Sequence, residues 1–383
     1  IYIHLIKKAL EEKKQVLYLL PEIALTVQIT SRLRHVFGNQ LGIYHSKYSD
    51  AERVEIWKKQ LSSNPYNVVL GARSAVFLPF NRLGLVIIDE EHETSFKQQD
   101  PSPRYHARSV AIVLANMYKA KVLLGTATPS MESYYNAEQG KYGLVTLNTR
   151  YKDIELPEIN VVDTKDLQHR KMMTGPFSPS LIGAIKNALQ NDQQVILFQN
   201  RRGFAPMVEC RTCGWVPKCT NCDVSLTFHK NMNQLTCHYC GFTYQVPTVC
   251  PACGATDLRG RGYGTEKVEE YVQQLFPEAR VARMDLDTTR TRNAYERLID
   301  DFSNGRTNLL IGTQMVSKGL DFGNVSVVGI LDADTMLNYP DFRSYEHAYM
   351  MMSQVSGRAG RKGKQGKVYL QTKNKELRLI HQV

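Results

Sequence analysis

Residues 85–92 read Leu85-Val86-Ile87-Ile88-Asp89-Glu90-Glu91-His92. Four apolar residues in a row are typical of a strand buried on both faces, as in parallel sheets that helices cover on both sides. The polar residues that follow stand at the carboxyl end of this strand, where open α/β sheets place their ligands. Asp89 could hold Mg²⁺ there, and Glu90 could polarise a water molecule for attack on a terminal phosphate. A solvated acidic turn is the simpler alternative.

Around this stretch, short apolar runs alternate with amphipathic stretches, which indicates a parallel α/β architecture. In the first half, a helix is predicted over residues 1–10 and strands over 16–20, 68–71, 83–88 and 121–124. In the second half, strands are predicted over 194–198, 281–284, 308–311, 325–331 and 367–371, with a helix over 265–276. We therefore expect two similar α/β units, one over residues 1–152 and one over 181–206 and 259–383, joined by a proline-containing linker over 153–180.

The composition is that of a globular chain with room for roughly two or three domains. It has 383 residues, of which 43% are hydrophobic and 22% charged. No apolar run approaches the roughly 18 residues that a transmembrane helix needs, and no secretory signal opens the chain. The 48 Lys and Arg against 37 Asp and Glu give a net charge of +11, which suggests a polyanionic partner without identifying it.

The cysteines form four Cys-x-x-Cys pairs within one short stretch. They are Cys210, Cys213, Cys219, Cys222, Cys237, Cys240, Cys250 and Cys253, and the chain has no other cysteine. Two thiolates at this spacing fit one tetrahedral zinc ion better than they fit disulfide geometry. The absence of a secretory signal also favours a reducing compartment, in which disulfides are rare. Zinc is the prediction, with an iron–sulfur cluster or disulfides as alternatives.

Spacing suggests how these pairs share two ions. Fourteen residues, 223–236, separate the second pair from the third and suit a hairpin-like zinc ribbon. The predicted sites are therefore nested, as Cys219/Cys222/Cys237/Cys240 and Cys210/Cys213/Cys250/Cys253. The alternative is that the first and second pairs share one ion and the third and fourth share the other, although only residues 214–218 would then separate the first two pairs. Four sulfurs close the coordination sphere, so the insertion over 207–258 is structural or an interaction surface rather than catalytic.

Three further motifs place small, hydroxylated or basic residues after strands or at a helix end. Residues 123–130 read Leu-Leu-Gly-Thr-Ala-Thr-Pro-Ser, residues 311–322 read Ile-Gly-Thr-Gln-Met-Val-Ser-Lys-Gly-Leu-Asp-Phe, and residues 354–361 read Gln-Val-Ser-Gly-Arg-Ala-Gly-Arg. In the last motif Arg358 and Arg361 each follow a glycine and could neutralise charge on a transferring phosphoryl group. Ordinary capped turns and a basic helix end are the alternatives.

Together with residues 19–26, 71–74 and 200–203, these motifs resemble in order those of superfamily 2 helicases. With the cysteine pairs inserted between Arg202 and Gly264, essentially the whole chain resembles the helicase core of the bacterial primosomal replication-restart DNA helicases. The resemblance implies two RecA-like lobes that clamp ATP with Mg²⁺, and a 3′–5′ DNA helicase that recognises stalled or branched forks and restarts replication by primosome assembly. It also implies a monomer in the bacterial cytoplasm, with single-stranded and forked DNA, primosome proteins and single-strand-binding proteins as partners.

The resemblance also assigns roles to individual residues. Asp89, Glu90, Arg358 and Arg361 would be catalytic, Gly319, Asp321 and Gln354 would face the nucleotide, Thr126 and Thr128 would couple hydrolysis to DNA movement, and Arg73, Phe96, Arg104 and Tyr105 would contact DNA. In the loop over 95–106 the two aromatic rings could stack bases at about 1–3 kcal/mol each. An ordinary surface loop with both rings folded inward is the alternative.

The motif GxxxxGK[ST], whose lysine grips the β- and γ-phosphates, is absent from the sequence. The helix predicted from Ile1 resembles the helix that follows such a loop. We therefore expect this chain to be part of a longer helicase and to hydrolyse ATP poorly by itself. Two other functions stay open: a different superfamily 2 translocase that acts on RNA or duplex DNA, and a zinc-ribbon binding module on a nucleotide-inactive scaffold.

Overall fold

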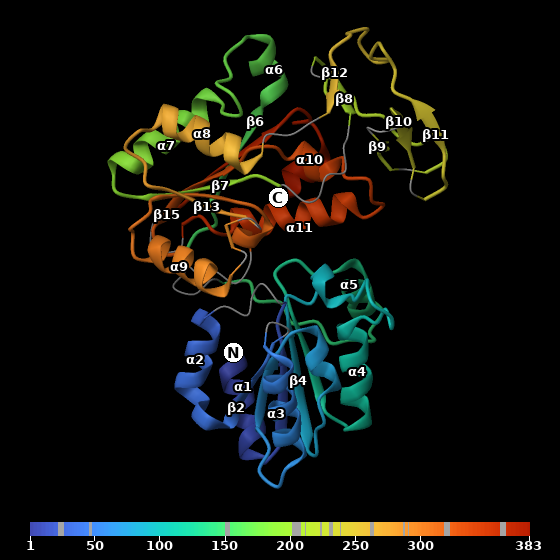
Figure 1. The fold of residues 1–383 in the computed structure, drawn as a ribbon, viewed down its shortest axis with the longest axis vertical. Coiled ribbons are helices and arrows are strands. Elements are labelled where there is room, and N and C mark those ends of the chain that lie inside the picture. The colour runs from blue at the N-terminus through green and yellow to red at the C-terminus, as the bar shows by residue number, and fades with distance from the viewer. Residues whose placement is uncertain are drawn as a thin grey trace. The chain divides into compact units, whose positions relative to one another are not determined.

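The computed structural model describes residues 1–21, 27–45, 48–149, 154–200, 208–210, 212–222, 224–229, 233–237, 239–260, 264–285, 288–289, 291–317, 322–360 and 365–383. The chain divides into two compact units, unit 1 over Ile1–Thr146 and unit 2 over Leu147–Val383. Each unit contains a parallel sheet with helices on both faces (Figure 1). Among the described residues, no helix has the length and apolar character needed to cross a lipid bilayer.

Unit 1 is built on a five-stranded parallel sheet with the order β2-β3-β1-β4-β5. The strands are β1 (Gln15–Leu19), β2 (Leu41–Tyr44), β3 (Val68–Gly71), β4 (Leu83–Asp89) and β5 (Lys121–Gly125). The helices are α1 (Tyr2–Glu11), α2 (Val27–Phe37), α3 (Asp50–Leu61), α4 (Ala107–Met117) and α5 (Met131–Glu138). The predicted first helix and four strands are confirmed, whereas the four-residue strand β2 gave no recognisable sequence pattern.

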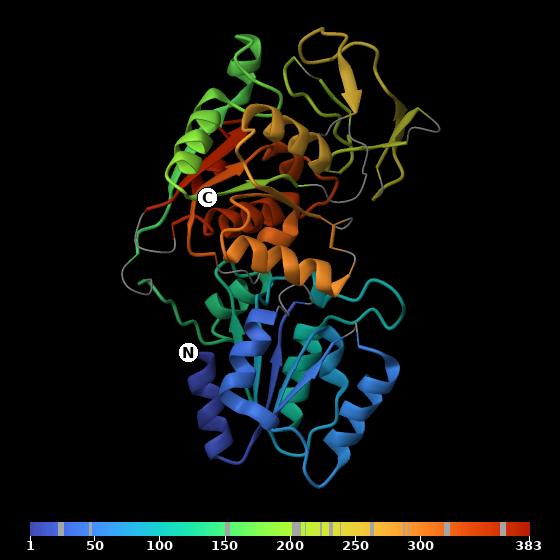
Figure 2. The ribbon, with the colours of Figure 1, turned by 60° about the vertical axis from the view of Figure 1, so that its left-hand side comes forward.

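Successive strand residues of unit 1 face two hydrophobic cores on opposite sides of the sheet, as the side-chain period of two requires. Tyr18 of β1 packs with Ile6 of α1, whereas its neighbours Leu17 and Leu19 pack on the opposite face with Ala111 of α4. Figure 2 shows helices on both sides of this sheet. Burial on both faces explains why the strand sequences are almost continuously apolar.

The strand order places a topological switch point between β1 and β4. The chain leaves β1 toward β3 and β2 on one side, and it leaves β4 toward β5 on the other. Open α/β sheets bind their ligands outside the carboxyl ends of the two strands that flank such a point. Asp89 is the last residue of β4 and therefore stands at this position.

Unit 2 contains a six-stranded parallel sheet with the order β13-β14-β7-β15-β16-β6. Its strands are β6 (Glu158–Asp163), β7 (Gln194–Phe198), β13 (Val281–Met284), β14 (Leu309–Gly312), β15 (Val325–Ile330) and β16 (Lys367–Thr372). Its helices are α6 (Thr164–His169), α7 (Pro179–Gln190), α8 (Thr265–Leu275), α9 (Arg292–Ser303), α10 (Asp334–Leu337) and α11 (Ser344–Ser356). Helices α7 and α8 cover one face, and α9, α10 and α11 cover the other (Figure 1).

The linker predicted over residues 153–180 contains a strand and a helix of unit 2, so the prediction is wrong over residues 158–169. Residues 158–163 form β6, which pairs in register with β16 from Glu158 opposite Lys367 to Asp163 opposite Thr372. Helix α6 follows directly, and Asp163 caps its first turn by accepting hydrogen bonds from the amides of Lys165 and Asp166. Because β6 is an edge strand of intermediate burial, its sequence lacks the apolar run that marks the central strands.

A small module inserted between β7 and α8 carries all eight cysteines, and we call residues 208–260 the cysteine module. Strand β8 (Val208–Cys210) pairs with β12 (Leu258–Gly260), and β9 (Thr227–His229), β10 (Gln234–Thr236) and β11 (Thr243–Gln245) form a three-stranded antiparallel sheet. Its buried apolar residues are few, and they include Val224, Leu226 and Leu235. A module with so small a core needs another source of stability.

Candidate active site and metal centres

The carboxylate of Asp89 is held by groups from three different elements. The hydroxyl of Tyr2, on α1, donates a hydrogen bond of 2.9 Å to Oδ1, and the Tyr18 hydroxyl, on β1, donates one of 3.4 Å to Oδ2. The backbone amide of Glu90 donates a third, of 3.1 Å, to Oδ1. Asp89 therefore lies at the switch point with a fixed orientation.

Burial raises the pKa of Asp89, while the hydrogen bonds from Tyr2, the Glu90 amide and Tyr18 act in the opposite direction. Burial and the nearby Asp89 charge also raise the pKa of both tyrosines, so they remain neutral donors. The site has no space for a larger residue at Gly125, because an added Cβ would lie 1.8 Å from the Tyr2 hydroxyl. A buried carboxylate is a hard oxygen ligand of the kind that Mg²⁺ prefers.

Glu90 follows Asp89 with a left-handed backbone conformation, φ +52°. Residues other than glycine adopt this conformation rarely and at a cost of order 1 kcal/mol, and such residues gather at functional sites. The turn leaves the Glu90 side chain 25% exposed, with Oε2 3.8 Å from Nε2 of His92. Glu90 is thus partly accessible to solvent at the strand end, as is Asp89, whereas Glu91 is buried.

The acidic motif and the motif after β5 are joined by several hydrogen bonds, of which one links two side chains, His92 and Thr126. Nδ1 of His92 lies 2.7 Å from Oγ1 of Thr126. The same hydroxyl accepts a hydrogen bond of 3.0 Å from the backbone amide of Thr128, whose own side chain is buried. Thr126 and Thr128, predicted to couple hydrolysis to movement, therefore lie next to the predicted catalytic carboxylates.

Sequence reasoning missed a buried network centred on Glu91. Its carboxylate forms an ion pair with Arg108 of α4 and accepts hydrogen bonds from the amide of Ser130 (2.8 Å) and the hydroxyl of Ser133 (2.7 Å). Arg108 also donates a hydrogen bond of 2.6 Å to the Ser130 hydroxyl. The sequence carried no local signal for this network, because Arg108 lies 17 positions from Glu91 on another element.

The predicted DNA-contacting residues of unit 1 lie on two neighbouring segments. Nη1 of Arg73 donates hydrogen bonds to the carbonyls of Ser95 (3.3 Å) and Lys97 (3.1 Å), which ties residues 71–74 to the loop after the acidic motif. Arg104 is exposed. Tyr105 is partly buried and packs edge-on against Phe77, with ring centroids 4.8 Å apart.

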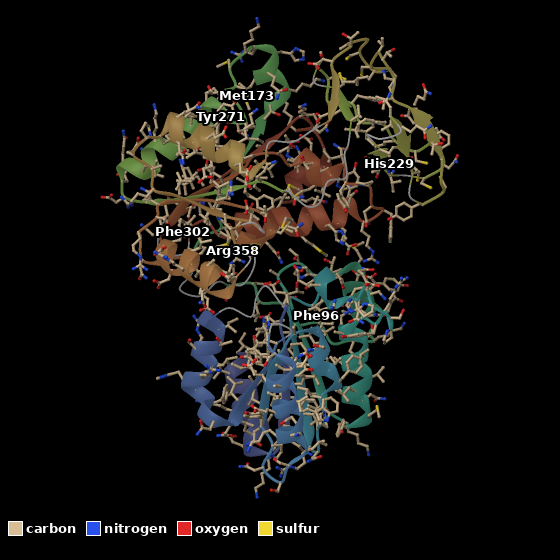
Figure 3. The ribbon with its side chains drawn as sticks, viewed as in Figure 1. Phe96, Met173, His229, Tyr271, Phe302 and Arg358 are labelled. Atoms are coloured by element: carbon tan, nitrogen blue, oxygen red, sulfur yellow. The ribbon has the colours of Figure 1, made fainter. Side chains whose placement is uncertain are left out.

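The prediction that Phe96 stacks on bases is contradicted by its position. Its ring is 1% exposed and belongs to the core on the α4 side of the sheet (Figure 3). An apolar ring immediately after a polar turn can either lie on the surface and stack on a ligand or pack into the core. Here the Phe96 ring packs into the core and holds the loop against unit 1. For Phe96 the alternative of an inward-folded ring is therefore correct.

In unit 2, Gln354 and Arg358 are both buried at the end of α11. Arg358 lies in the turn that follows α11 (Figure 3). In the same segment Gly360 has φ +71° and donates a backbone hydrogen bond of 2.9 Å to the carbonyl of Val325. Burial raises the pKa of Tyr295 to about 12, and the positive charge of Arg358 opposes this shift. Three other predicted residues, Gly319, Asp321 and Arg361, lie outside the described residues, as do 22–26 and 201–203 of the motifs.

The cysteines gather into the two nested groups that their spacing predicted. Within each group the ligand atoms all lie within 4.8 Å of one another, and the groups are Cys210/Cys213/Cys250/Cys253 and Cys219/Cys222/Cys237/Cys240. Sγ atoms across each group are 3.6 Å apart, as in Cys210 to Cys253 and Cys219 to Cys240. Thiolates about 2.3 Å from a tetrahedral zinc ion would be about 3.8 Å apart. All eight cysteines are free thiols, so the disulfide alternative is wrong.

Three of the four Cys-x-x-Cys pairs end in the same backbone turn. Gly214, Gly241 and Gly254 each follow the second cysteine of a pair with φ between +74° and +79°, a conformation that glycine adopts without steric cost. Each donates its amide to the carbonyl of the pair's first cysteine, over 2.9–3.0 Å. The tight turn brings both sulfurs of a pair to the same side, where one ion can bind them.

The cysteine module is attached to the sheet of unit 2 by a buried ion pair. Glu209, adjacent to Cys210 on β8, pairs with Lys373, which follows β16. The Lys373 amide donates a hydrogen bond of 2.8 Å to Asp334 at the start of α10. On the surface, Tyr239 of the module contacts Phe342 edge-on, with centroids 6.2 Å apart. The group Cys210/Cys213/Cys250/Cys253 is therefore connected to the carboxyl ends of the strands in the sheet of unit 2.

Family models match three separate parts of the chain. The DEAD/DEAH box helicase model matches residues 1–137, the model of the PriA DNA helicase Cys-rich region matches 219–244, and the helicase conserved C-terminal domain model matches 263–363. Unit 1 and the sheet of unit 2 are thus RecA-like helicase lobes, and the group Cys219/Cys222/Cys237/Cys240 lies within the matched Cys-rich region.

Curated relatives match almost the whole chain. A replication restart protein PriA from Bacillus subtilis is 45% identical over 97% of this chain and 46% of its own length, and one from Chlamydia trachomatis is 42% identical over 97% and 50%. The chain therefore spans about half the length of these relatives. Among solved structures, the Mycobacterium smegmatis helicase Lhr, bound to single-stranded DNA and AMP-PNP, has a TM-score of 0.53 at 15% identity, covering 94% of this chain and 40% of its own, which supports the fold alone.

Relatives that are 42–45% identical over 97% of this chain, together with a match to the PriA Cys-rich region model, show the family. The chain belongs to the PriA family of replication restart helicases.

Proposed function

We propose that this chain is the motor region of an ATP-driven DNA helicase that translocates 3′ to 5′, recognises stalled or branched replication forks, and restarts replication by primosome assembly. The support is the family membership together with the site on unit 1. There, a carboxylate fixed by hydrogen bonds, a partly exposed second carboxylate and a hydrogen-bonded threonine motif share one strand edge. Phosphoryl transfer uses a carboxylate that holds Mg²⁺ and a residue that positions or activates the nucleophile.

In this proposal Asp89 would hold the Mg²⁺ that accompanies ATP, which would supply positive charge next to the phosphates. Glu90 accepts the proton of the attacking water, because it is the accessible carboxylate of the motif. Gly319, Asp321 and Gln354 contact the nucleotide, and Arg358 and Arg361 contact its phosphates. An arginine in that role accelerates hydrolysis by about 10³–10⁵ where it has been measured.

The observation that carries the proposal is the unequal environment of Asp89 and Glu90. Both side chains are partly exposed, but the Asp89 carboxylate is fixed by three hydrogen bonds, as suits a metal ligand, while Glu90 lies in a left-handed turn with its side chain 25% exposed, as suits a base that meets water. In a solvated acidic turn neither carboxylate would be oriented by buried hydroxyl groups. The contrast therefore favours the catalytic interpretation of residues 89–92.

The test is DNA-stimulated ATP hydrolysis by the full-length protein. Glu90→Gln and Arg358→Ala should each reduce turnover at least about 10³-fold, whereas Glu138→Gln, an exposed carboxylate on α5, should leave it unchanged. Normal turnover in Glu90→Gln would contradict the assignment. Strand displacement on forked DNA against RNA duplexes separates the proposed function from an RNA translocase, and a full-length protein that binds no nucleotide would be the nucleotide-inactive scaffold.

For the 383 residues alone we expect little hydrolysis, because the sequence contains no P-loop lysine. Robust ATPase activity of this chain by itself would overturn that expectation. We further propose that the protein acts in the bacterial cytoplasm as a monomer, on single-stranded and forked DNA, together with primosome and single-strand-binding proteins. Arg73, Arg104 and Tyr105 are the proposed DNA contacts of unit 1.

The cysteine module is proposed to bind two zinc ions. The free energy of zinc binding, on the order of 10–16 kcal/mol in small finger peptides, would stabilise a module with few buried apolar residues. Strand separation and contacts with primosome proteins are the two tasks that fit such a module. Its sulfur ligands close each ion's coordination sphere, so neither task includes catalysis by the metal.

A further inference from the structure

Two tyrosines that no sequence motif singled out converge on one carboxylate. Tyr2 comes from the first turn of α1 and Tyr18 from the middle of β1, yet both hydroxyls reach Asp89 at the end of β4. Their rings pack edge-on with centroids 5.5 Å apart, and Tyr18 is almost fully buried. Burying a phenol hydroxyl has a free-energy cost unless the hydroxyl forms a hydrogen bond, so these two hydroxyls serve a purpose beyond packing.

We propose that Tyr2 is a positioning residue: its hydrogen bond fixes Oδ1 of Asp89 and so leaves Oδ2 oriented to bind a divalent cation. Tyr18 donates only a long, weak hydrogen bond to Oδ2, which the cation would replace. This inference rests on the proposed function, in which Asp89 holds the ion that accompanies the nucleotide. Tyr2 and Tyr18 touch neither ion nor nucleotide in it; they act through Asp89.

The difference between the two oxygens follows from their acceptor capacity. A carboxylate oxygen has about two acceptor positions. Among the described residues, Oδ1 uses both, at 2.9 Å from the Tyr2 hydroxyl and 3.1 Å from the Glu90 amide. Oδ2 has a single long hydrogen bond, at 3.4 Å from Tyr18. A metal ion would therefore bind Oδ2, and Asp89 would then lose only the weakest of its three hydrogen bonds.

The anchor has little freedom to move. An added Cβ at position 125 would lie 1.8 Å from the Tyr2 hydroxyl and 3.3 Å from Oδ1 of Asp89, so Gly125 closes directly on the hydrogen bond. On its other side the Tyr2 ring rests on Tyr18. Groups that orient a metal ligand from behind in this manner commonly affect metal affinity by about 10- to 100-fold.

The two tyrosines should respond in opposite ways to loss of the hydroxyl. In Tyr2→Phe, Oδ1 keeps only the Glu90 amide, the carboxylate can rotate, and cation affinity should fall about tenfold, as for a lost hydrogen bond to a charged group. In Tyr18→Phe, the cation no longer displaces a donor from Oδ2. Its affinity should be unchanged or rise by up to about threefold, because the displaced bond is long.

The experiment uses the full-length protein and a fluorescent ATP analogue, and measures the Mg²⁺ concentration at which nucleotide binding is half-saturated. The control is Tyr118→Phe, which removes a hydroxyl that donates a 2.6 Å hydrogen bond to the carbonyl of Phe80, away from Asp89. Nucleotide affinity without Mg²⁺ is measured for every variant, and it should stay constant if the variant is folded. Direct Mn²⁺ binding, followed by electron paramagnetic resonance, gives a second readout that needs no turnover.

The proposal is supported if the Mg²⁺ midpoint rises about tenfold in Tyr2→Phe while Tyr18→Phe and Tyr118→Phe remain within about threefold of the wild type. It is overturned if Tyr2→Phe behaves as the control does, or if both tyrosine variants lose cation affinity equally. Asp89→Asn separates this outcome from failure of the proposed function. If Asp89→Asn abolishes the Mg²⁺ dependence and Tyr2→Phe does not change it, only the role of Tyr2 is wrong; if Asp89→Asn has no effect, Asp89 does not hold the ion at all.

Discussion

The carboxylate of Glu91 forms a buried ion pair with Arg108, a residue of the helix that covers the adjacent face of the sheet. Glu91 is fully buried at its side chain, and the hydroxyls of Ser130 and Ser133 satisfy its remaining acceptor positions. The three consecutive acidic residues therefore differ in environment: Asp89 is oriented by three hydrogen bonds, Glu90 is partly exposed in a left-handed turn, and the buried Glu91 joins the strand end to α4 and α5. This network fixes the backbone on which the two proposed catalytic carboxylates stand.

Breaking this pair should destabilise unit 1 strongly. Arg108→Met leaves the Glu91 charge buried without its cation, and loss of one partner of a buried pair costs about 3–5 kcal/mol. The measurement is the free energy of unfolding from urea denaturation. The exposed pair Arg170–Asp166, with N and O 3.3 Å apart, is the control, and Asp166→Ala should cost about 1 kcal/mol or less. Equal costs for the two variants would show that Glu91 is not held as described.

Removing the hydroxyl of Thr126 should uncouple hydrolysis from unwinding. Thr126→Val keeps the shape of the side chain but breaks the 2.7 Å contact with His92 and the bond from the Thr128 amide. In the full-length protein we expect ATP turnover within about threefold of the wild type and strand displacement reduced at least about tenfold, since Asp89 and Glu90 are untouched. Thr126→Ser retains the hydroxyl and should retain unwinding. A parallel loss of both activities in Thr126→Val would contradict a coupling role.

Much of the sheet architecture could be predicted from the sequence, because central parallel strands are buried on both faces and read as apolar runs. Two edge strands, β6 and β2, were missed, although the edge strands β5 and β13 were predicted. Edge strand β6, with residues of intermediate burial such as Asn160, was interpreted as a linker. Strand β2 reads Leu-Gly-Ile-Tyr, so that Gly42 interrupts its apolar run. The missed strands are therefore those whose sequences lack an uninterrupted apolar run.

The candidate site was predicted unevenly. The metal ligands were found because CxxC spacing directly encodes a tetrahedral site, and the nested groups are confirmed. Phe96 was assigned wrongly, because a ring beside a polar loop gives no sequence sign of whether it faces inward. Tyr2, Tyr18 and Arg108 were missed, because their roles depend on contacts between elements 17 to 87 positions apart. Such tertiary partners have no local spacing rule.

Each cysteine group should bind one ion independently of the other. Cys219→Ser removes one thiolate from the group that includes Cys240, and metal analysis of the purified protein should then find about one zinc per chain instead of two. Thr220→Ala, within the same Cys-x-x-Cys pair, should retain both ions. Loss of both ions in Cys219→Ser would contradict independent sites, and iron in the wild-type protein would overturn the assignment of zinc.

Stability should fall below neutral pH in a way that depends on His106. This residue precedes α4, and its Nδ1 accepts a 3.3 Å hydrogen bond from the Arg108 amide, which requires a neutral ring. Burial lowers the pKa of His106 to about 4, and the positive charges of Arg108 and Lys97 add to this shift. In the unfolded chain a histidine has a pKa near 6.5. Between pH 6.5 and 4 the unfolded state therefore binds more protons, so the free energy of unfolding decreases as the pH falls.

His106→Asn isolates this contribution, because asparagine also caps helices but does not titrate in this range. Between pH 7 and 4 the wild type should lose about 1 to 2 kcal/mol more stability than the variant, a figure reduced from the full linkage value because the ring is partly exposed. Urea denaturation of both proteins at pH 7, 5.5 and 4 gives the difference directly, and all other titrating groups cancel in it. Curves that stay parallel across this range would mean that His106 is already free to protonate in the folded protein.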